Sequence, residues 1–438
     1  MKTRAVRLYG KDDLRLEEFE LPPIREDEIL ARVVSDSICM SSHKAAKQGA
    51  EHKRVPKDIA RNPTIIGHEF CGTILEVGRK WQHRFKPGSK FAIQPAINYQ
   101  GSLAAPGYSY RYIGGDATAV IIPNEFMECG CLLDYTGEAY FAASLAEPMS
   151  CIVGAFHAIY HSKPGTYVHD MGIVRGGAMA ILAGAGPMGL GAIDYAIHCD
   201  RRPGLLVVTD IDDARLSRAA SLLTEADAQS NGVKLVYVNT SRLPNPAEHL
   251  VSLTGGPSTI AQGHPEEARM GGKGFDDVLV FAPVRPVVES GDRILGRDGC
   301  LNFFAGPLDP NFSAPVNFYN VHYGSTHALG TSGGNTDDMI ESLDLMSRGR
   351  INPAAMVTHV GGLDAVIETT LNLPNIPGGK KLIYTGLSMP LTAIGDFEEK
   401  GRRDPVFAEL ARIAHRHGGL WSAEAEKYLL ENAGRLGR

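Results

Sequence analysis

The stretch Ala178-Met-Ala-Ile-Leu-Ala-Gly-Ala-Gly-Pro-Met-Gly189 decides the fold of this 438-residue chain. Its first six residues are apolar, as in a buried strand, and the glycines that follow have the spacing G-x-G-x-x-G. An apolar, helix-like segment continues to Cys199. A strand, a glycine turn and a helix in this order indicate a dinucleotide-binding turn. We therefore predict that the pyrophosphate lies at the helix N-terminus, against Gly184, Gly186, Pro187, Met188 and Gly189.

The next apolar strand, Leu205-Leu-Val-Val-Thr-Asp210, ends in an acidic residue 210 − 189 = 21 positions after the last glycine. A carboxylate at this point accepts a hydrogen bond from the ribose 2′-hydroxyl of NAD and repels the 2′-phosphate of NADP. Asp210 therefore favours NAD as the cofactor. NADP stays open, because three arginines near in sequence could bind a phosphate: Arg201, Arg202 and Arg215. A glycine turn that serves packing alone is the remaining alternative.

Strands and helices alternate across residues 151–330, which predicts a doubly wound parallel sheet, an α/β fold. Residues 1–150 contain mostly short strands rich in β-branched residues and punctuated by glycine. Residues 335–348 form an amphipathic pattern typical of a helix, and residues 351–386 return to strands and loops. The segment 387–438 is a polar, helical extension, and the glycine-rich stretch 255–275 is expected to be a surface loop.

Composition excludes several classes of protein. Lys+Arg 44 against Asp+Glu 50 gives a net charge of −6, so we expect no nucleic-acid partner. No apolar run approaches the ~18 residues of a membrane span, and the N-terminus lacks a secretion signal. Seven scattered cysteines are an odd number, which argues against a disulfide framework. We expect a protein of the reducing cytoplasm that does not bind membranes.

A second group of residues comes from three separate segments of the N-terminal part. Cys39 precedes Gly67-His68-Glu69, and Glu147-Pro148 follows later. A thiolate, an imidazole and a carboxylate suit a catalytic zinc that keeps an open position. Each residue also has a structural explanation: Cys39 as a small buried apolar residue, His68 as a hydrogen-bonded core histidine, and Glu147 at the start of a helix with Pro148 in its first turn.

Gly67-His-Glu-x-x-Gly72-x-x-x-x-x-Gly78, with the upstream cysteine and the later nucleotide fold, resembles the zinc-dependent medium-chain alcohol dehydrogenases. The resemblance covers about residues 1–386. It implies a GroES-like, mostly-β catalytic domain at 1–150, a Rossmann-type domain at 151–330, and a return of 331–386 to the catalytic domain. Ala146-Glu147-Pro148 resembles the polyol branch of that family. This implies that Cys39, His68, Glu69 and Glu147 serve as zinc ligands, with Glu69 and Glu147 competing or exchanging at the metal.

Departures from the family pattern refine these expectations. Many relatives hold a structural zinc with four cysteines, but the corresponding stretch 96–115 contains none. We therefore predict one catalytic zinc and no structural zinc, and a packing role for Cys129 and Cys131. The family's relay hydroxyl is present as Ser41, our candidate for the first proton acceptor. The usual aspartate is Ser42 and the usual histidine is Lys44, so His43 is the second relay candidate.

Between Lys44 and Arg61 there are six basic and two acidic residues, a local charge of 6 − 2 = +4. This excess predicts an anionic substrate such as a sugar phosphate, and a solvated loop is the alternative. With the chain length, the Cys-Met-Ser-Ser-His run and the C-terminal extension, it resembles the bacterial L-sorbose-1-phosphate reductases. The candidate phosphate ligands are Lys44, Lys47, Lys53 and Arg54.

The sequence thus favours a zinc- and nicotinamide-dependent oxidoreductase for a ketose phosphate and a polyol phosphate, of the L-sorbose 1-phosphate and D-glucitol 6-phosphate type. The alternatives are a dehydrogenase of unphosphorylated polyols such as sorbitol or xylitol, and a zinc-free, non-catalytic nucleotide-binding protein. We expect a homo-oligomer, a dimer or a tetramer.

Overall fold

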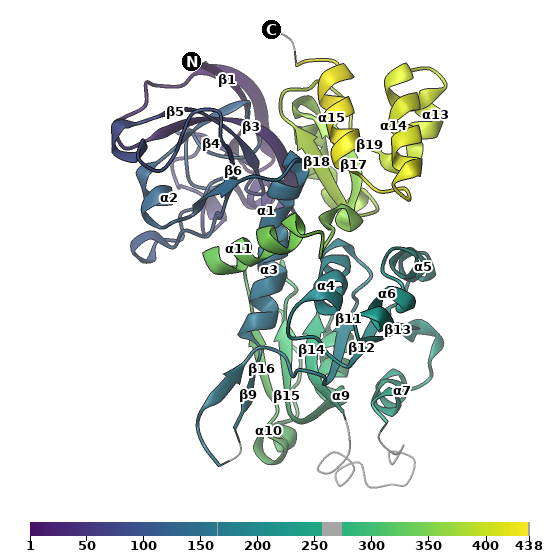
Figure 1. The fold of residues 1–438 in the computed structure, drawn as a ribbon. Coiled ribbons are helices and arrows are strands. Elements are labelled where there is room, and N and C mark those ends of the chain that lie inside the picture. Colours follow the sequence, from purple (N-terminus) through teal and green to yellow (C-terminus); the bar gives the residue numbers. More distant parts are fainter. Residues whose placement is uncertain (164, 256–273, 437–438) are drawn as a thin grey trace. The chain divides into compact units, whose positions relative to one another are not determined.

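The computed structural model divides into two compact units, and helix α3 (Tyr140–Ala158) contributes residues to both. Unit 1 comprises Met1–Pro148, Asn335–Arg348 and Pro353–Arg438, and unit 2 comprises Met149–Gly334 and Gly349–Asn352. The structure describes all residues except 164, 256–273 and 437–438 (Figure 1). Most of the expected loop at 255–275 therefore lies outside the described residues.

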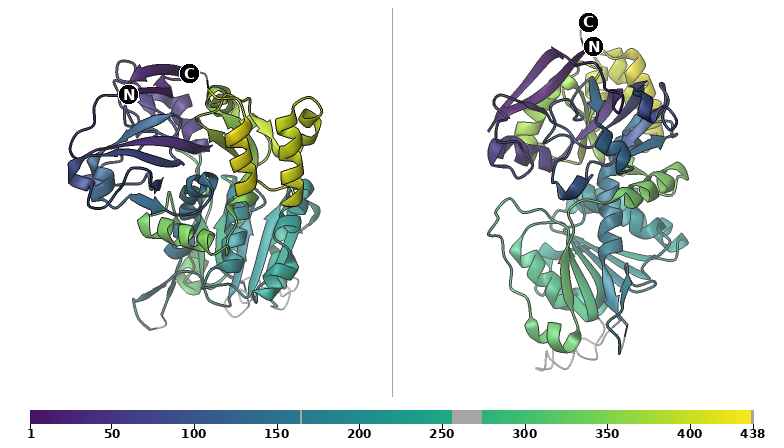
Figure 2. Two further views of the ribbon diagram at one scale, coloured as in Figure 1. Left: turned by 45° about the horizontal axis from the view of Figure 1, so that its top comes forward. Right: turned by 90° about the vertical axis from the view of Figure 1, so that its left-hand side faces the viewer.

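Unit 2 is built on a six-stranded parallel sheet with the order β13-β12-β11-β14-β15-β16. The chain begins in the middle of the sheet, adds two strands on one side and then crosses to the other side, which confirms the predicted doubly wound sheet. Right-handed crossovers place α4–α6 on one face and α7, α9 and α10 on the other, and Figure 2 shows the strands between helices. The elements are β11 (Ala178–Leu182), α4 (Pro187–His198), β12 (Leu205–Asp210), α5 (Asp213–Leu222), α6 (Glu225–Ser230), β13 (Lys234–Asn239), α7 (Pro246–Leu253), β14 (Phe275–Val280), α9 (Arg285–Ile294), β15 (Leu295–Phe303), α10 (Phe318–Gly324) and β16 (His327–Gly330).

The inner strands of this sheet are nearly continuous apolar runs because helices cover both faces. Ala180, Val207 and Val278, from three adjacent strands, are completely buried in one core. A separate hairpin of β9 (Tyr160–Ser162) and β10 (His169–Met171) precedes the sheet, and β9 packs against β15.

Unit 1 is mostly antiparallel β-structure. A long sheet runs in the order β19-β17-β18-β3-β5-β6-β8, with β7 also paired to β3, and a second sheet has the order β2-β1-β4. Phe70 and Phe91 meet edge to face in the hydrophobic core of this unit. The strands are β1 (Lys2–Gly10), β2 (Asp13–Glu20), β3 (Ile29–Ile38), β4 (Thr64–Ile65), β5 (Cys71–Val77), β6 (Lys90–Ile93), β7 (Ala119–Ile122), β8 (Leu132–Tyr135), β17 (Val357–Gly362), β18 (Lys380–Tyr384) and β19 (Thr392–Ala393).

The chain returns from unit 2 to unit 1 through α11 (Thr336–Ser347), a helix that the sequence pattern predicts. Asn335 and Asp338 form a capping box at its start, and Met339 is completely buried on its inner face. Strand β18 then pairs antiparallel with β3, with Lys381 opposite Ile38. This register brings the start of β18 next to the end of β3, where the candidate site begins. Before the C-terminal extension, this unit also contains the helices α1 (Met40–Gln48), α2 (Asn124–Glu128) and α12 (Val366–Asn372).

The C-terminal extension forms α13 (Phe397–Gly401), α14 (Pro405–Arg416) and α15 (Ala423–Asn432), drawn in yellow in Figure 1. It docks on unit 1 through buried polar contacts. The Trp421 indole donates to the Tyr384 hydroxyl at 2.7 Å. The Glu426 carboxylate accepts the amide N–H groups of Tyr140 at 2.5 Å and Phe141 at 2.7 Å, at the N-terminus of α3. The extension therefore caps a helix that runs through both units.

All seven cysteines are free thiols. Among the described residues, no helix combines the length and the apolarity needed to cross a bilayer.

Candidate active site

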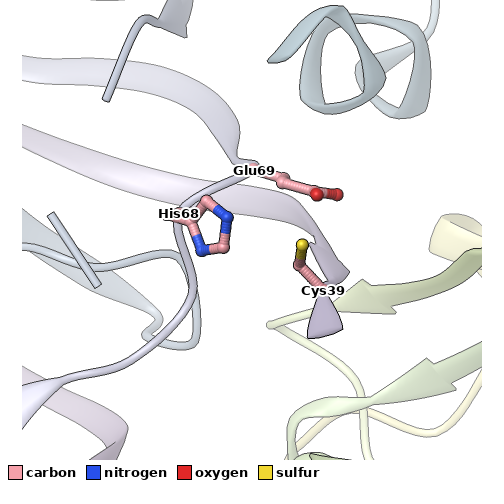
Figure 3. Close-up of side chains that lie close together, drawn as sticks. All are labelled: Cys39, His68 and Glu69. Carbon is pink, nitrogen blue, oxygen red and sulfur yellow. The ribbon is translucent and has the colours of Figure 1, made fainter. Parts of the chain in front are cut away.

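The structure brings together three of the predicted zinc ligands at the end of β3. Cys39 follows β3 directly in an extended conformation and starts α1, while His68 and Glu69 lie in the turn between β4 and β5. One ligand atom from each side chain lies within 4.8 Å of the others (Figure 3). Gly67 precedes them with a φ of +88°, and a Cβ there would lie 2.7 Å from the Asp116 amide nitrogen. Only glycine fits this turn, which presents His68 and Glu69 to Cys39.

The donor set of this group fits a zinc ion. Burial lowers the pKa of His68 to about 4, so its ring is neutral at physiological pH, as metal binding requires. Burial raises the pKa of Cys39 to about 12, with contributions from the charges of Glu69 and Glu147. A thiol buried in this way loses its proton and becomes a thiolate only when a cation lies next to it. A buried thiol, a neutral imidazole and a carboxylate in mutual reach therefore match the ligands that zinc prefers.

Glu69 is held by a residue that the sequence analysis missed. The Lys380 ammonium donates to both carboxylate oxygens of Glu69, at 2.6 Å to Oε2, and the Ser37 hydroxyl donates to Oε2 as well. Burial alone would raise the pKa of Glu69, but Lys380, His68 and Ser37 together lower it. Glu69 is therefore an anion locked by a buried lysine. No local pattern points to Lys380, because it reaches Glu69 only through the pairing of β18 with β3.

The structural explanation considered for Glu147 is wrong. Pro148 lies inside α3, eight residues after Tyr140, and not in the first turn of a helix. The apolar residues before Glu147 already belong to the helix, which continues through the proline at the loss of one backbone hydrogen bond. Glu147 is buried and lies outside the 4.8 Å group, but its charge acts on the Cys39 thiol.

Two further hydroxyl groups touch His68. The Tyr108 hydroxyl lies 3.2 Å from Nδ1 of His68, and the Ser42 hydroxyl lies 3.3 Å from the same atom. Burial raises the pKa of Tyr108 well above its ordinary value, while a hydrogen bond with the predicted relay residue Ser41 opposes that rise. No sequence pattern marks Tyr108, which comes from a loop forty residues after His68.

His43, the second relay candidate, points to a different partner. Its Nδ1 lies 2.8 Å from the Thr370 carbonyl oxygen, which fixes Nδ1 as the donor and leaves Nε2 as the nitrogen that can take a proton. The ring is buried between α1 and α12.

The predicted basic loop is partly helical, since Lys44 and Lys47 lie in α1. Helix α1 continues past Ser42 because no glycine or proline occurs before Gly49. One cation of this segment, Arg54, lies beside Tyr108. The Arg54 guanidinium lies 5.5 Å from the centre of the Tyr108 ring, and the His52 ring stacks on the same tyrosine.

The charges in this segment act on one another. Burial lowers the pKa of His52 to about 4, and the charges of Arg54, Lys53 and Lys44 lower it further. Burial also lowers the pKa of Lys44, with a contribution from Lys53. Three of the four predicted phosphate ligands, Lys44, Lys53 and Arg54, therefore act electrostatically on the same imidazole. Lys47 differs, because it forms a salt bridge with Asp12 at 2.8 Å.

Two buried carboxyl groups, those of Asp36 and Asp116, lie next to the turn that carries His68 and Glu69. Asp36 Oδ1 accepts the Glu69 amide N–H at 3.1 Å. Burial, together with Asp116 and Glu69, raises the pKa of Asp36 well above its ordinary value, and burial raises the pKa of Asp116 to about 8. The two side chains share a hydrogen bond. One proton is therefore held between them, because two adjacent buried carboxylates would repel each other.

The glycine turn of unit 2 has the form that the sequence predicts. β11 ends at Leu182, and α4 begins at Pro187 with Gly186 as its N-cap. A Cβ on Gly186 would meet no atom within 4 Å, which leaves space for a pyrophosphate, whereas a Cβ on Gly189 would lie 2.0 Å from the Gly184 carbonyl oxygen. The left-handed residue of the turn is Ala183, with a φ of +54°, and not a glycine.

Asp210 ends β12 beside this turn. Its Oδ2 accepts the Ala185 amide N–H at 3.2 Å, and its Oδ1 accepts the Ile211 amide N–H at 2.8 Å. The carboxylate therefore helps to hold the turn. Arg201 donates to the Met171 carbonyl and the Asp170 carboxylate, and Arg215 lies 3.8 Å from Asp212. These contacts occupy two of the three arginines considered for a 2′-phosphate.

Residues 25–130 match the family model described as the alcohol dehydrogenase GroES-like domain, which confirms the fold class expected for the first part of the chain. With the doubly wound sheet of unit 2, the chain belongs to the medium-chain alcohol dehydrogenase family and is an oxidoreductase.

Within that family, two relatives match this chain along nearly its whole length. L-sorbose 1-phosphate reductase of Klebsiella pneumoniae is 50% identical over 431 residues, 98% of each chain. Mannitol-1-phosphate 5-dehydrogenase of Aliivibrio fischeri is 50% identical over 430 residues, again 98% of each. The crystal structure of 2R,3R-butanediol dehydrogenase from Bacillus subtilis has the same fold, with a TM-score of 0.67 and 19% identity over 87% of this chain and 99% of that one.

Proposed function

We propose that the protein interconverts a ketose phosphate and a polyol phosphate, of the L-sorbose 1-phosphate and D-glucitol 6-phosphate type, with a nicotinamide coenzyme and one catalytic zinc. The observation that carries this proposal is the Arg54 guanidinium, which lies 5.5 Å from the centre of the Tyr108 ring, while the Tyr108 hydroxyl contacts His68. The charges of Lys53 and Lys44 act with Arg54 on the neighbouring His52. The two relatives named for sugar-phosphate substrates support it.

The position of these cations favours a particular phosphate. In L-sorbose 1-phosphate the phosphate is carried by the carbon next to the carbonyl carbon. An enzyme for this substrate therefore needs positive charge close to the group that binds the carbonyl oxygen. Arg54 meets this need, because its guanidinium stacks on the ring whose hydroxyl contacts His68.

Cys39 and His68 would hold the zinc, with Glu69 or Glu147 as the carboxylate ligand. Bound zinc acts as a Lewis acid, which polarises a ketone or lowers the pKa of an alcohol. Lys380 and Ser37 favour Glu147 as the resting ligand, because they already balance the charge of the Glu69 carboxylate and hydrogen-bond both of its oxygens. Exchange of Glu69 into the zinc shell during turnover remains part of the proposal. A four-cysteine structural zinc is not part of it.

Ser41 is the hydroxyl proposed to take the substrate proton, with Tyr108 as its hydrogen-bonding neighbour. His43 is the second candidate through its Nε2. For the coenzyme we propose NAD, which binds at Gly184, Gly186, Pro187, Met188 and Gly189, with its ribose hydroxyl on Asp210. We also propose a cytoplasmic homo-oligomer, dimer or tetramer, whose mass light scattering would measure.

A substrate panel tests the proposal. D-glucitol, D-glucitol 6-phosphate and D-mannitol 1-phosphate are each assayed with NAD and NADP. We expect the highest kcat/KM for D-glucitol 6-phosphate with NAD. A higher value for bare glucitol would establish the unphosphorylated-polyol alternative, and a higher value for mannitol 1-phosphate would place the phosphate far from the reacting carbon. Metal analysis of protein prepared without chelator addresses the zinc-free alternative, which requires no turnover and a zinc content that Cys39→Ser does not lower.

A further inference from the structure

A second group of potential metal ligands lies in unit 2, far along the chain from Cys39 and His68. His161 belongs to β9, Asp298 to β15 and His327 to the first position of β16. One ligand atom from each of the three side chains lies within 4.8 Å of the others. They come from separate segments, so their proximity is a property of the fold and not of a local motif.

The ring nitrogens and the carboxylate face one another. Nδ1 of His161 lies 3.8 Å from Oδ2 of Asp298, and Nδ1 of His327 lies 4.0 Å from Oδ1. Ligands of a tetrahedral zinc are roughly 3.4 Å apart, given zinc–ligand bonds of about 2.0–2.2 Å. The two distances from the histidines to Asp298 therefore exceed this spacing by only about half an ångström, on the same bond lengths.

One oxygen of Asp298 lacks a hydrogen-bond partner. Oδ2 accepts the Ser162 amide N–H at 2.9 Å, whereas Oδ1 is a buried atom that finds no donor among the described residues. Oδ1 is also the oxygen that faces His327. A buried carboxylate oxygen without a donor is costly, and a cation would satisfy it.

The second ring nitrogen of each imidazole, Nε2, has a hydrogen-bond partner of the kind found in metal sites. Nε2 of His161 lies 2.9 Å from the carboxylate of Asp277, which is completely buried, and Nε2 of His327 lies 2.6 Å from the Tyr160 carbonyl oxygen. Metal-binding histidines usually donate their second ring N–H to a carboxylate or a backbone carbonyl, which fixes the ring and its tautomer. Both rings have this arrangement, and the Nδ1 atoms lie 3.8 Å and 4.0 Å from the oxygens of the Asp298 carboxylate.

The backbone of β15 is distorted where it presents Asp298. Phe275 pairs with Leu295 and Asp277 with Cys300, so five positions on β15 oppose two on β14. Asp298 lies in this bulge with a φ of +56°. Bulges and left-handed non-glycine residues are costly and often orient a functional side chain.

We infer that His161, Asp298 and His327 form a second cation site, which binds zinc or a similar divalent transition metal through His161 Nδ1, Asp298 Oδ1 and His327 Nδ1. The side chains of His161 and His327 are 10% and 14% exposed and that of Asp298 is 26% exposed, so water completes the coordination. The ion fastens the β9–β10 hairpin to β15 and β16. The role is structural and separate from the proposed catalytic zinc.

The competing explanation is a pair of protonated histidines. Each Nδ1 also lies 2.9 Å from a backbone carbonyl oxygen, that of Asp298 for His161 and that of Ser325 for His327. A proton on every ring nitrogen would satisfy these contacts without a metal. The two explanations differ in the number of metal ions that the protein binds.

Metal counting on the full-length protein decides between them. Protein stripped with chelator is titrated with Zn²⁺ by calorimetry, and with Co²⁺ by absorption spectroscopy. We expect two equivalents in the parent. Cys39→Ser should bind one, without the thiolate charge-transfer absorption of Co²⁺. His327→Gln and Asp298→Asn should each bind one equivalent of metal, and the Co²⁺ form of each should keep this absorption. His322→Gln changes an exposed histidine and is the matched control, which should bind two equivalents. Asparagine tolerates the left-handed backbone at position 298.

Thermal unfolding provides a second measurement. Zn²⁺ should raise the unfolding midpoint of Cys39→Ser but leave that of Cys39→Ser combined with His327→Gln unchanged, because only a bound ion stabilises the folded state. The inference is overturned if Cys39→Ser binds no Zn²⁺. It is also overturned if both His327→Gln and Asp298→Asn retain two equivalents. Loss of the catalytic ion alone affects neither outcome, so the two sites are tested separately.

Discussion

The ammonium group of Lys380 lies 2.6 Å from Oε2 of Glu69, and both side chains are almost fully buried. The strand pairing of β18 with β3 sets this ion pair next to Cys39, whose pKa also responds to Lys380. Glu69 is thus kept as an anion beside the proposed zinc without needing the zinc as its partner. Lys380 positions the carboxylate and keeps its charge balanced.

Replacing Lys380 with methionine should strongly destabilise the metal-free protein. The variant leaves the Glu69 charge buried and unpaired, which costs about 3–5 kcal/mol of unfolding free energy. Adding Glu69→Gln to this variant should restore a large part of the lost unfolding free energy, because the unpaired charge is then removed. Denaturant unfolding with chelator present measures all three variants. Equal stabilities of the single and double variants would show that the ion pair does not govern this region.

Cys39→Ser should lose the zinc equivalent of the proposed catalytic site and nearly all activity, because an alcohol is a much poorer zinc ligand than a thiolate. Cys129→Ser is the control, because Cys129 does not belong to the group of Cys39, His68 and Glu69. This variant should keep the parental zinc content and activity. Glu147→Gln should lower the zinc content more than Glu69→Gln does, since Lys380 already holds Glu69. Zinc analysis and initial rates on the same preparations give the answer. The reverse order for the two glutamates would make Glu69 the resting ligand.

Removing the charge of Asp210 should weaken the preference for NAD. Asp210→Ala should reduce the ratio of kcat/KM for NAD to that for NADP by about tenfold or more, since ~1.4 kcal/mol is a modest charge effect. Asp210→Asn is the gentler variant, because its amide oxygen still accepts one of the backbone N–H groups that hold the turn. If both variants keep the parental ratio, Asp210 serves only the turn.

The sequence was sufficient for features that a continuous segment encodes. The glycine turn between β11 and α4 is one example, because its strand, glycines and helix follow one another within 178–198. Even there, the strained residue is Ala183, which no pattern marks. Cys39, His68 and Glu69 were found through their spacing and the resemblance it supports.

Residues placed by long-range pairing were missed. Lys380 is 311 positions from Glu69, and its role depends on the register of β18 against β3. Tyr108 comes from an irregular loop that carries no periodic pattern. Charge counting also could not separate Lys47 from its neighbours, because only the fold brings Asp12 to it.

The Glu426 carboxyl group should make stability depend on pH. Burial raises its pKa to about 7 in the folded state, above the ordinary value of 4.5, although the Phe141 and Tyr140 N–H groups oppose this. The folded state therefore binds the proton more tightly, and its contribution to stability is lost as the pH rises from about 4.5 through about 7. Glu426→Gln should reduce the fall in unfolding midpoint between pH 4 and about 8, the range that spans both pKa values. Glu431→Gln, exposed on the same helix, is the control. Identical pH profiles for parent and Glu426→Gln would assign the dependence to other groups.

Arg54 and Lys47 provide the sharpest test of the phosphate proposal, because they share a charge and a segment but not a location. Arg54→Ala removes the guanidinium over Tyr108, whereas Lys47→Ala removes a cation paired with Asp12. A charge-assisted hydrogen bond is worth roughly 1.5–3 kcal/mol, so Arg54→Ala should lower kcat/KM for D-glucitol 6-phosphate by about 10- to 150-fold. Lys47→Ala should stay close to the parent.

Lys44→Ala and Lys53→Ala should follow Arg54→Ala. Bare glucitol should respond to none of these variants, and added salt should weaken only the phosphorylated substrate. Remote binding energy of this kind also orients the reacting carbon, so part of the loss should fall on kcat. If Arg54→Ala and Lys47→Ala treat both substrates alike, the cations are a solvated surface, and the protein acts on unphosphorylated polyols.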